Sequence, residues 1–310
     1  MASIASLERL AVALQAVMDA GAIRAGQPLA LHTTLRVGGP ADLLVEAKTL
    51  AALERAVGLA AQFGVPCRVL GSGANLLVSD AGVRELVVLN RAKSVSFSAG
   101  YVRAESGAAL AQVARRSVSC GLSGLEWAVG IPGTMGGAVV GNAGAWGGDI
   151  AGSMLSAAVL EAEGIAGEWT VRHFGFDYRT SVLKQQPGAG RRAVVLAASF
   201  RLKEAERGAL EARVADIQSR RRATQPSGAS CGSVFKNPPG DYAGRLIDRA
   251  GLKGSWCGGA QISPVHANFI VNRRGASAAD VKALIDRASQ EVLLRFGVQL
   301  ELEIELVGEW

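Results

Sequence analysis

The chain has 310 residues, a formal net charge of +6, 49% hydrophobic residues and 19% charged residues. This length predicts about two domains, and the sequence has no run of about eighteen apolar residues that would indicate a membrane span. Aromatic residues make up only 5%, which argues against a nucleic-acid surface built on base stacking. We therefore expect a soluble protein that binds neither a membrane nor nucleic acid, and its positive charge suits a small anionic substrate.

The amino-terminal stretch and the cysteines favour a cytoplasmic protein. Residues 1–21 are apolar but lack a basic leader and a clear cleavage site, so an amphipathic surface helix is the better interpretation. No two cysteines form a CxxC pair, and no histidine lies at zinc-ligand spacing from them. We expect no metal site, and free thiols at the four cysteines Cys67, Cys120, Cys231 and Cys257.

The apolar pattern predicts helices and short strands in irregular order along the chain. In the first half we expect a helix at 49–63, strands starting at 66 and at 85, a hairpin at 95–97 and 101–104, and a helix at 108–120. In the second half we expect strands near 156–161, 168–172 and 193–200, helices at 204–222 and 277–296, and an alternating strand at 300–306. This mixture indicates an α+β fold rather than a regular βαβ repeat.

A glycine-rich stretch at residues 130–148 reads GIPGTMGGAVVGNAGAWGG, with eight glycines in nineteen residues. No Lys or Arg occurs between Arg116 and Arg172, so an anion held here would depend on main-chain N–H groups. A flexible linker is the alternative, but the apolar residues among the glycines argue against it. We interpret the stretch as a cradle for the pyrophosphate of a nucleotide cofactor.

A second glycine loop, GSGAN at residues 71–75, follows an apolar run and precedes Leu76 and another strand-like run. Only half of the dinucleotide fingerprint GxGxxG is present, and no helix follows it. The sequence also lacks a Walker A motif, so a Rossmann fold and a P-loop kinase are both disfavoured. We expect the two glycine loops to hold one ligand between two subdomains.

The residues that could carry chemistry are ambiguous on their own. The histidines, His32, His173 and His266, have no Ser or Cys partner in an evident triad. Arg179 could be a surface ion pair, and Ser233 an ordinary turn serine. For Glu303, the strand pattern gives no preference over Glu301 or Glu305.

Seven motifs together resemble the UDP-N-acetylenolpyruvoylglucosamine reductase family, in its shorter class without an extra substrate-capping loop. The similarity runs in order from about residue 32 to 308, with residues 185–192 as a variable loop. His32 and Leu35 stand where the family often has Asn and Phe. The motifs are GSGANLLV (71–78), GLEWAVGIPGTMGGAVVGNAGAWGG (124–148), DYRTS (177–181), SCGSVFKNPPG (230–240), AGRLIDRAGLKG (243–254), GGAQISPVHANFIVN (258–272) and GVQLELEIELVG (297–308).

The resemblance implies an oxidoreductase that uses non-covalent FAD and NADPH to reduce UDP-GlcNAc-enolpyruvate to UDP-N-acetylmuramate in peptidoglycan synthesis. It implies an FAD-binding domain of the vanillyl-alcohol-oxidase (PCMH) type at 1–203, with its core at 36–202 and two subdomains divided near 92. A C-terminal α+β substrate-binding domain would follow at 204–310. We expect a monomer by default.

The family's functional positions carry over residue by residue. The implied catalytic residues are Arg179, Ser233 and Glu303, of which Glu303 is open to a two-residue slip. The implied FAD contacts are Gly71, Ser72, Gly73, Ala74, Asn75, Leu76, Gly130, Ile131, Pro132, Gly133, Thr134, Gly136, Gly137, Ala138, Asn142, Ala143 and Gly144. The substrate candidates are Arg221 or its neighbour Arg220, Lys236, Asn237, His266 and Asn268.

Two structural alternatives stay open for the substrate candidates. The run Arg220 to Arg222 could simply end a helix, where cations favour the helix dipole. His266 could be a core histidine with its hydrogen bonds satisfied. Two other functions also remain: a related FAD oxidoreductase acting on a small hydroxy acid, and a non-catalytic nucleotide-sugar-binding protein.

Overall fold

The computed structural model describes residues 4–161, 164–185 and 193–310, which divide into two compact units. Unit 1 comprises Met1–Ala25, Leu43–Gly71 and Glu85–Arg220, and unit 2 comprises Gly26–Asp42, Ser72–Arg84 and Arg221–Trp310. Each unit is therefore built from segments that are distant in sequence. The expected domain division at 203/204 stays a prediction, and residues 186–192 of the expected variable loop lie outside the described residues.

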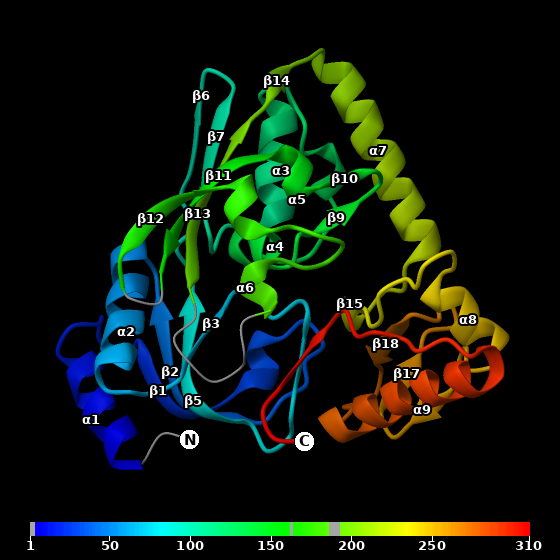
Figure 1. Cartoon of the computed structure of the whole chain (residues 1–310), viewed down its shortest axis with the longest axis horizontal. Coiled ribbons are helices and arrows are strands. Elements are labelled where there is room, and N and C mark those ends of the chain that lie inside the picture. Colours follow the sequence, from blue (N-terminus) through cyan, green and yellow to red (C-terminus); the bar gives the residue numbers. More distant parts are fainter. Residues whose placement is uncertain (1–3, 162–163, 186–192) are drawn as a thin grey trace. The chain divides into compact units, whose positions relative to one another are not determined.

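The helices follow the sequence-based expectations where the expected segment was long and amphipathic (Figure 1). Thr49 caps the second of them through a hydrogen bond from Ala52 N to its Oγ1, and Gly64 follows with φ +65°. The α-helices are α1 (Ile4–Gln15), α2 (Leu50–Gln62), α3 (Leu110–Ser119), α4 (Met135–Val140), α5 (Ile150–Ser153), α6 (Val182–Gln185), α7 (Arg207–Thr224), α8 (Ala243–Arg249) and α9 (Ala278–Phe296). Three short 3-10 helices are η1 (Leu29–His32), η2 (Glu126–Ala128) and η3 (Val171–Phe174).

Within the described residues, the strands form three larger sheets and three two-stranded pairings. The first larger sheet has the order β1 (Ile23–Pro28), β2 (Pro40–Ala47), β5 (Val83–Asn90), β3 (Cys67–Leu70), and the second has the order β12 (Ala166–Thr170), β11 (Met154–Leu160), β13 (Val194–Arg201), β7 (Tyr101–Glu105), β6 (Val95–Ser98). The third has the order β15 (Ala229–Ser233), β18 (Phe269–Asn272), β17 (Ala260–Ile262), β16 (Trp256–Cys257). The pairs are β9 (Gly144–Ala145) with β10 (Gly148–Asp149), β8 (Leu122–Ser123) with β14 (Lys203–Glu204), and β4 (Leu76–Val78) with β19 (Glu305–Val307).

Unit 1 has a core between the five-stranded sheet and helices α3 and α4. Helix α3 buries Leu110, Val113 and Val118 in this core, and Gly121 follows the helix with φ +69°. The hairpin of β6 and β7 turns at Ala99 and the following glycine, with Ser98 opposite Tyr101. The predicted helix at 108–120 and hairpin at 95–104 are therefore confirmed. A second cluster of buried residues in unit 1 packs α1 and α2 against β2 and β5.

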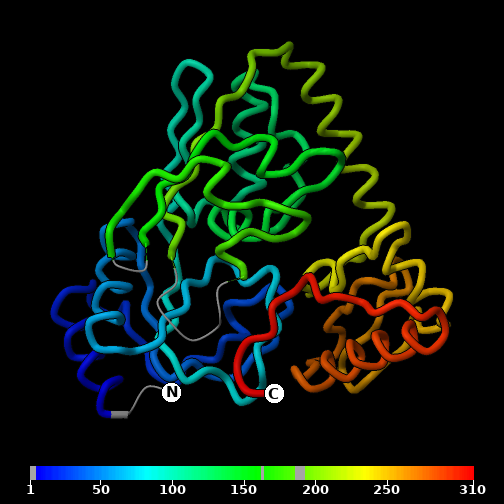
Figure 2. Tube along the Cα trace, in the orientation of Figure 1, coloured from blue at the N-terminus to red at the C-terminus, as the bar shows by residue number. Residues whose placement is uncertain are grey.

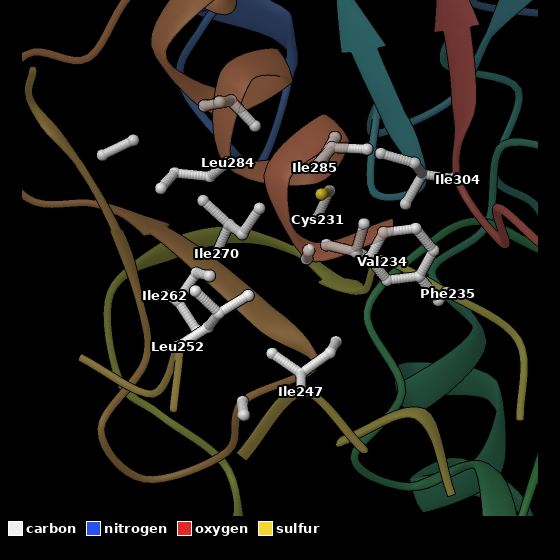
Figure 3. Close-up of a cluster of buried hydrophobic side chains, with 14 of the residues drawn as sticks. Cys231, Val234, Phe235, Ile247, Leu252, Ile262, Ile270, Leu284, Ile285 and Ile304 are labelled. Carbon is white, nitrogen blue, oxygen red and sulfur yellow. The ribbon is translucent and has the colours of Figure 1, made fainter. Parts of the chain in front are cut away.

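Unit 2 has its own core, built around α9 and the sheet of β15, β18, β17 and β16. Ser277 caps α9 by accepting a hydrogen bond from Asp280 N, and Gly297 ends it with φ +69°, as predicted. Figure 3 shows Val234, Phe235 and Ile304 gathered beside Cys231, all within one buried cluster. The segments on either side of the catalytic candidates are thus anchored in this core.

The end of the chain returns to an early segment of unit 2. Strand β19 pairs in parallel with β4, so that Glu305 lies opposite Leu76 and Val307 opposite Val78. Figure 2 shows this C-terminal segment, in red, running beside the segment that contains β4. The first glycine loop directly precedes β4, so this pairing fixes the end of the loop against the C-terminal residues.

Two expectations about local structure are wrong, and one helix was not predicted from the sequence. The strand expected at 168–172 ends at Thr170, because Thr170 and His173 form a capping box that starts η3. The strand expected at 300–306 is broken: Leu302 makes an isolated bridge to Phe235, and regular pairing starts only at Glu305. A helix, α4, forms inside the glycine-rich stretch, where glycine content alone argued against one.

Candidate functional site

The first glycine loop, residues 71–75, turns the chain from β3 into β4. Within the described residues, the N–H groups of Ser72, Gly73 and Ala74 donate no hydrogen bond, and the Ser72 hydroxyl is buried without a partner. Gly73 has φ +61°, and a Cβ here would collide with the carbonyl oxygen of His32. Successive N–H groups left unpaired in a glycine turn attract an anion. The loop can therefore bind a phosphate group.

In the second glycine segment, some N–H groups donate hydrogen bonds within the protein and others have no acceptor there. Met135 N donates to Ala108 O and Gly136 N to Ser106 O, each at 2.8 Å, at the start of α4. In the described part of the chain, Gly133, Thr134 and Gly137 have N–H groups without an acceptor. Only some residues of the predicted cradle therefore have N–H groups that can bind an anion.

The two glycine segments meet within unit 1. A Cβ on Gly71 would collide with Oγ1 of Thr134 and would lie 2.9 Å from its Cγ2. Arg91, which follows β5, donates from Nη1 to Gly71 O at 3.1 Å. The expectation that no cation lies near these loops is wrong at this point, because Arg91 is twenty residues from the loop in sequence and only the fold brings it there.

Arg179 lies in a strained loop of unit 1. Its backbone has φ +57°, which is uncommon for a residue with a Cβ, and its side chain is half-buried. Its Nη2 donates to Gly144 O at 2.5 Å, and its guanidinium lies 5.5 Å from the centre of the Tyr178 ring. A pocket of about 300 Å³ borders Arg179, Tyr178 and Asn142.

Ser233 ends strand β15 in unit 2, opposite Phe269 of β18. A register shift separates Ser230 from Ser233, and Gly232 between them has φ +81°. Such a bulge re-aims the side chain that follows it. In the parts of the chain that are described, the Ser233 hydroxyl makes no hydrogen bond, so it remains available to a ligand.

Glu303 lies at the bend between the Leu302 bridge and β19. Its N–H donates to Val234 O at 2.9 Å, and its carbonyl accepts from Nδ2 of Asn75 at 3.0 Å. Asn75 O in turn accepts from Glu305 N at 2.9 Å. Glu303 is therefore bonded both to the end of the first glycine loop and to the residue after Ser233.

The neighbouring Glu301 has a different environment. Its carboxylate forms an ion pair with Nζ of Lys236, and its side chain is 72% exposed. Glu303 is less exposed, and burial together with its charge raises the pKa of the Cys231 thiol to about 12. Thus, the structure distinguishes Glu303 from Glu301, which the sequence pattern left equivalent.

The substrate candidates have contrasting partners. Asn268 is 3% exposed, and both ends of its amide bond Phe235: Nδ2 donates to O at 2.8 Å and Oδ1 accepts from N at 2.9 Å. Asn237 Oδ1 accepts from Ala243 N at the start of α8. These contacts give Asn268 and Asn237 structural partners within unit 2.

The basic candidates differ in exposure. Arg220 forms an exposed ion pair with Asp216, whereas Arg221 is half-buried, and desolvation lowers the pKa of its guanidinium. His266 lies edge-on to Phe269, with ring centres 5.0 Å apart. Burial, and then the charge of Lys253, lower the pKa of His266 below 6.5.

The catalytic candidates are divided between the units. Ser233 and Glu303 are joined through main-chain bonds in unit 2, and Arg179 belongs to unit 1. Among the residues described, no cluster of three or more His, Cys, Asp or Glu side chains could hold a metal ion. No helix in the described ranges is long and apolar enough to span a membrane.

Comparison with known families finds two matching regions. Residues 41–169, which include both glycine segments and Arg91, match the FAD binding domain family. Residues 224–307, which include Ser233 and Glu303, match the family described as UDP-N-acetylenolpyruvoylglucosamine reductase, C-terminal domain. The first match supports the predicted FAD-binding fold, and it covers both glycine segments.

Similar proteins cover almost the whole chain. The UDP-N-acetylenolpyruvoylglucosamine reductase 2 of Symbiobacterium thermophilum is 45% identical over 94% of this chain and 94% of its own. The corresponding reductase of Chloroflexus aggregans is 43% identical over 92% and 97%. The crystal structure of UDP-N-acetylenolpyruvylglucosamine reductase from Thermus caldophilus is 38% identical, with a TM-score of 0.79 over 92% of this chain and 100% of that one.

Proposed function

The chain belongs to the UDP-N-acetylenolpyruvoylglucosamine reductase family, and from that premise we propose that Arg179, Ser233 and Glu303 carry its reaction. The reaction is the NADPH-dependent reduction of UDP-GlcNAc-enolpyruvate to UDP-N-acetylmuramate, with FAD as the cofactor. The match of the C-terminal region disfavours a hydroxy-acid oxidoreductase that shares only the FAD-binding fold.

The residues around the two glycine segments fit FAD. In unit 1, the unpaired N–H groups of Gly133, Thr134 and Gly137 and the cation of Arg91 would hold its pyrophosphate. In unit 2, the unpaired N–H groups of the first glycine loop and the buried Ser72 hydroxyl offer donors to a phosphate group. When bound, FAD accepts a hydride from NADPH and supplies it to the terminal carbon of the enol ether. We expect the flavin to be non-covalent, because neither glycine segment contains a His or Cys that could attach it.

Arg179 would stabilise the negative charge that hydride addition pushes onto the substrate carboxylate. A guanidinium has five N–H donors, so a bond to Gly144 O can orient it while other donors bind the carboxylate. Charge stabilisation of this kind acts where charge develops in the transition state.

Ser233 would give a proton to the carbon that becomes carbanionic. Hydride addition turns the CH₂ group of the enol ether into CH₃, and the neighbouring carbon then needs one proton to become CH. A serine hydroxyl is a weak acid, so it can serve only a strongly basic centre and needs a proton source behind it. Its bulged position and unengaged hydroxyl support this role.

Glu303 would share a proton with the substrate carboxylate or orient the Arg179 guanidinium. Its position at the bend, bonded through its backbone to Val234 and Asn75, supports this assignment over Glu301. For the UDP diphosphate, the half-buried Arg221 and Lys236 are better supported than the exposed Arg220. Asn237 and His266 remain candidates for the same substrate.

The observation that carries this proposal is the set of hydrogen bonds in unit 2 that runs from Asn75 to Glu303 and from Glu303 to Val234. Thr34 adds a second connection, since its Oγ1 donates to Ser230 O at 2.7 Å and its N–H to Gly73 O at 3.2 Å. The first cofactor loop and two proposed catalytic residues therefore belong to one hydrogen-bonded set. A nucleotide-sugar-binding protein without catalysis would not require that coupling.

The test is to measure the two half-reactions of Ser233→Ala separately under anaerobic conditions. NADPH should reduce the flavin at the wild-type rate, and reoxidation by UDP-GlcNAc-enolpyruvate should slow by about 10²–10⁴. Ser230→Ala, in the same strand before the bulge, is the matched control and should leave both rates unchanged. Equal slowing of both half-reactions in Ser233→Ala would contradict the role of proton donor.

We further propose that the protein is a cytoplasmic monomer that binds no nucleic acid. The four cysteines are free thiols in the structure, which supports a reducing compartment. Sedimentation of the purified protein would test the monomer, and a second species at micromolar concentration would contradict it.

A further inference from the structure

The loops around Arg179 are unusually strained. In the described ranges, five residues other than glycine have positive φ, and three of them are Asn142 (+42°), Trp146 (+55°) and Arg179 (+57°). Such backbone conformations persist only where surrounding contacts enforce them. The contacts that enforce the conformation of Arg179 are therefore part of how its side chain is presented.

Asn142 makes the principal contact of this kind. It is 5% exposed, and its Nδ2 donates to Asp177 O at 3.0 Å while its Oδ1 accepts from Ala151 N at 3.0 Å. One side chain thus joins the Arg179 loop to the chain that follows β10. Both ends of the amide therefore have a protein partner within unit 1.

A second contact fixes the other side of the Arg179 loop. Ser181 is fully buried, and its Oγ donates to Val140 O at 2.6 Å. Arg179 therefore lies between two hydrogen bonds, at Asp177 and Ser181, that lead to residues 140 and 142. Both bonds reach the C-terminal end of α4 and the residues that follow it.

That segment also carries the acceptor for the guanidinium. Gly144 O, two residues after Asn142, receives Nη2 of Arg179. Gly144 has no room for a side chain, because a Cβ would lie 2.7 Å from Cβ of Asp149 and 3.2 Å from Nη1 of Arg179. A shift at Asn142 would consequently move both the backbone of Arg179 and the carbonyl that orients its side chain.

We propose that Asn142 is a positioning residue that sets the Arg179 guanidinium for reduction of the enolpyruvyl substrate. This inference rests on the proposed function, because it acts through the catalytic role of Arg179. Only Asn meets all the requirements here: it tolerates the left-handed conformation, it donates to Asp177 O, and it accepts from Ala151 N.

The experiment compares Asn142→Asp with Asn142→Gly in the FAD-loaded enzyme. The Asp variant keeps the acceptor for Ala151 N and loses the donor to Asp177 O, and the Gly variant keeps the positive φ but loses both bonds. We expect anaerobic reoxidation by substrate to slow about 10- to 100-fold, as for a misplaced catalytic group. Flavin content and reduction by NADPH should stay at wild-type values.

The matched control is Asn272→Asp in unit 2. Asn272 likewise uses both amide ends, with Nδ2 donating to Leu35 O at 3.2 Å and Oδ1 accepting from Ala276 N at 2.9 Å. These hydrogen-bond partners lie in unit 2, whereas the Arg179 loop belongs to unit 1, and we expect both half-reactions to be unchanged. Equal slowing in this control would attribute the Asn142 result to general destabilisation and would overturn the inference.

A double-mutant cycle separates positioning from other roles. If Asn142 acts through Arg179, the double variant Asn142→Gly, Arg179→Ala should be no slower than Arg179→Ala alone. Additive losses, wild-type rates in the Asn142 variants, or loss of FAD from them would overturn the inference while leaving the role of Arg179 intact. A wild-type reoxidation rate in Arg179→Ala would instead refute the proposed function, and this inference with it.

Discussion

The Arg179 region of unit 1 and the Ser233–Glu303 region of unit 2 are each held by a buried asparagine, but in different ways. Asn142, itself at positive φ, bridges the strained loop of Arg179 and the segment at Ala151. Asn268 bonds twice to the single residue Phe235, in the manner of a missing strand neighbour. The first region depends on individual side chains, and the second depends mainly on main-chain pairing.

The two regions should respond differently to substitution of their side chains. Main-chain bonds from Glu303 to Val234 and from Glu305 to Asn75 do not depend on side-chain identity. Asp177, a partner of Asn142, is exposed, so water can replace a lost bond there, whereas Phe235 is 2% exposed. We therefore expect Asn268 to contribute mainly to stability and Asn142 mainly to rate.

The largest effect on stability is expected for Asn268→Ala. This change leaves N and O of Phe235 buried without partners, at a cost of about 1–3 kcal/mol for each group. The free energy of unfolding in denaturant should fall by about 2–6 kcal/mol, and by less in Asn268→Asp, which keeps the acceptor for Phe235 N. If Asn142→Gly destabilises the protein as much as Asn268→Ala does, the two asparagines do not differ in the way proposed.

A smaller effect is expected where the two glycine segments touch. Gly71→Ala forces its Cβ against Thr134, and overpacking of this kind costs about 1–3 kcal/mol. Because we propose that these residues border the FAD site, we expect weaker FAD binding by titration of the apoprotein. Gly58→Ala in α2 is the control, since a Cβ there would have no atom within 4 Å.

The same collision provides a rescue test. Replacing Thr134 by Ala in the Gly71→Ala background removes Oγ1 and Cγ2, the atoms nearest the new Cβ. FAD binding should recover in the double variant. If Gly71→Ala binds FAD normally, the contact between the segments serves packing alone, and the two-loop cradle loses its support.

The smallest effect concerns pH and His266. Burial, followed by the charge of Lys253, holds the pKa of His266 below 6.5 in the folded protein. As pH falls below 6.5, the unfolded chain therefore binds the proton first, and stability decreases until the folded-state pKa is passed.

His266→Gln should remove this contribution to the pH dependence. The unfolding midpoint of the variant should fall less between pH 7.5 and 5.5 than that of the wild type. An identical decrease in both proteins would show that other groups set the pH dependence of the region around Phe269 and Asn268.

The α+β class, the long helices and the family could all be predicted from local features of the sequence. Helices such as α3 and α9 could be predicted because an apolar face, a capping residue and a terminal glycine lie within one short stretch. The motifs around Arg179 and Ser233 could be recognised for the same reason, because each lies within a short run of sequence. The glycine loops indicated an anion site because the conformational freedom of glycine is a property of the residue itself.

Which residues around these motifs form hydrogen bonds with distant parts of the chain became visible only in the folded structure. It brought Arg91 to Gly71, bent the chain at Glu303, and committed Met135 and Gly136 to hydrogen bonds within the fold. It also gave Asn142 two protein partners, where the sequence grouped it with the cofactor contacts. Hydrogen bonds between residues far apart in sequence leave no periodic or local pattern, so they can be read only after the chain has folded.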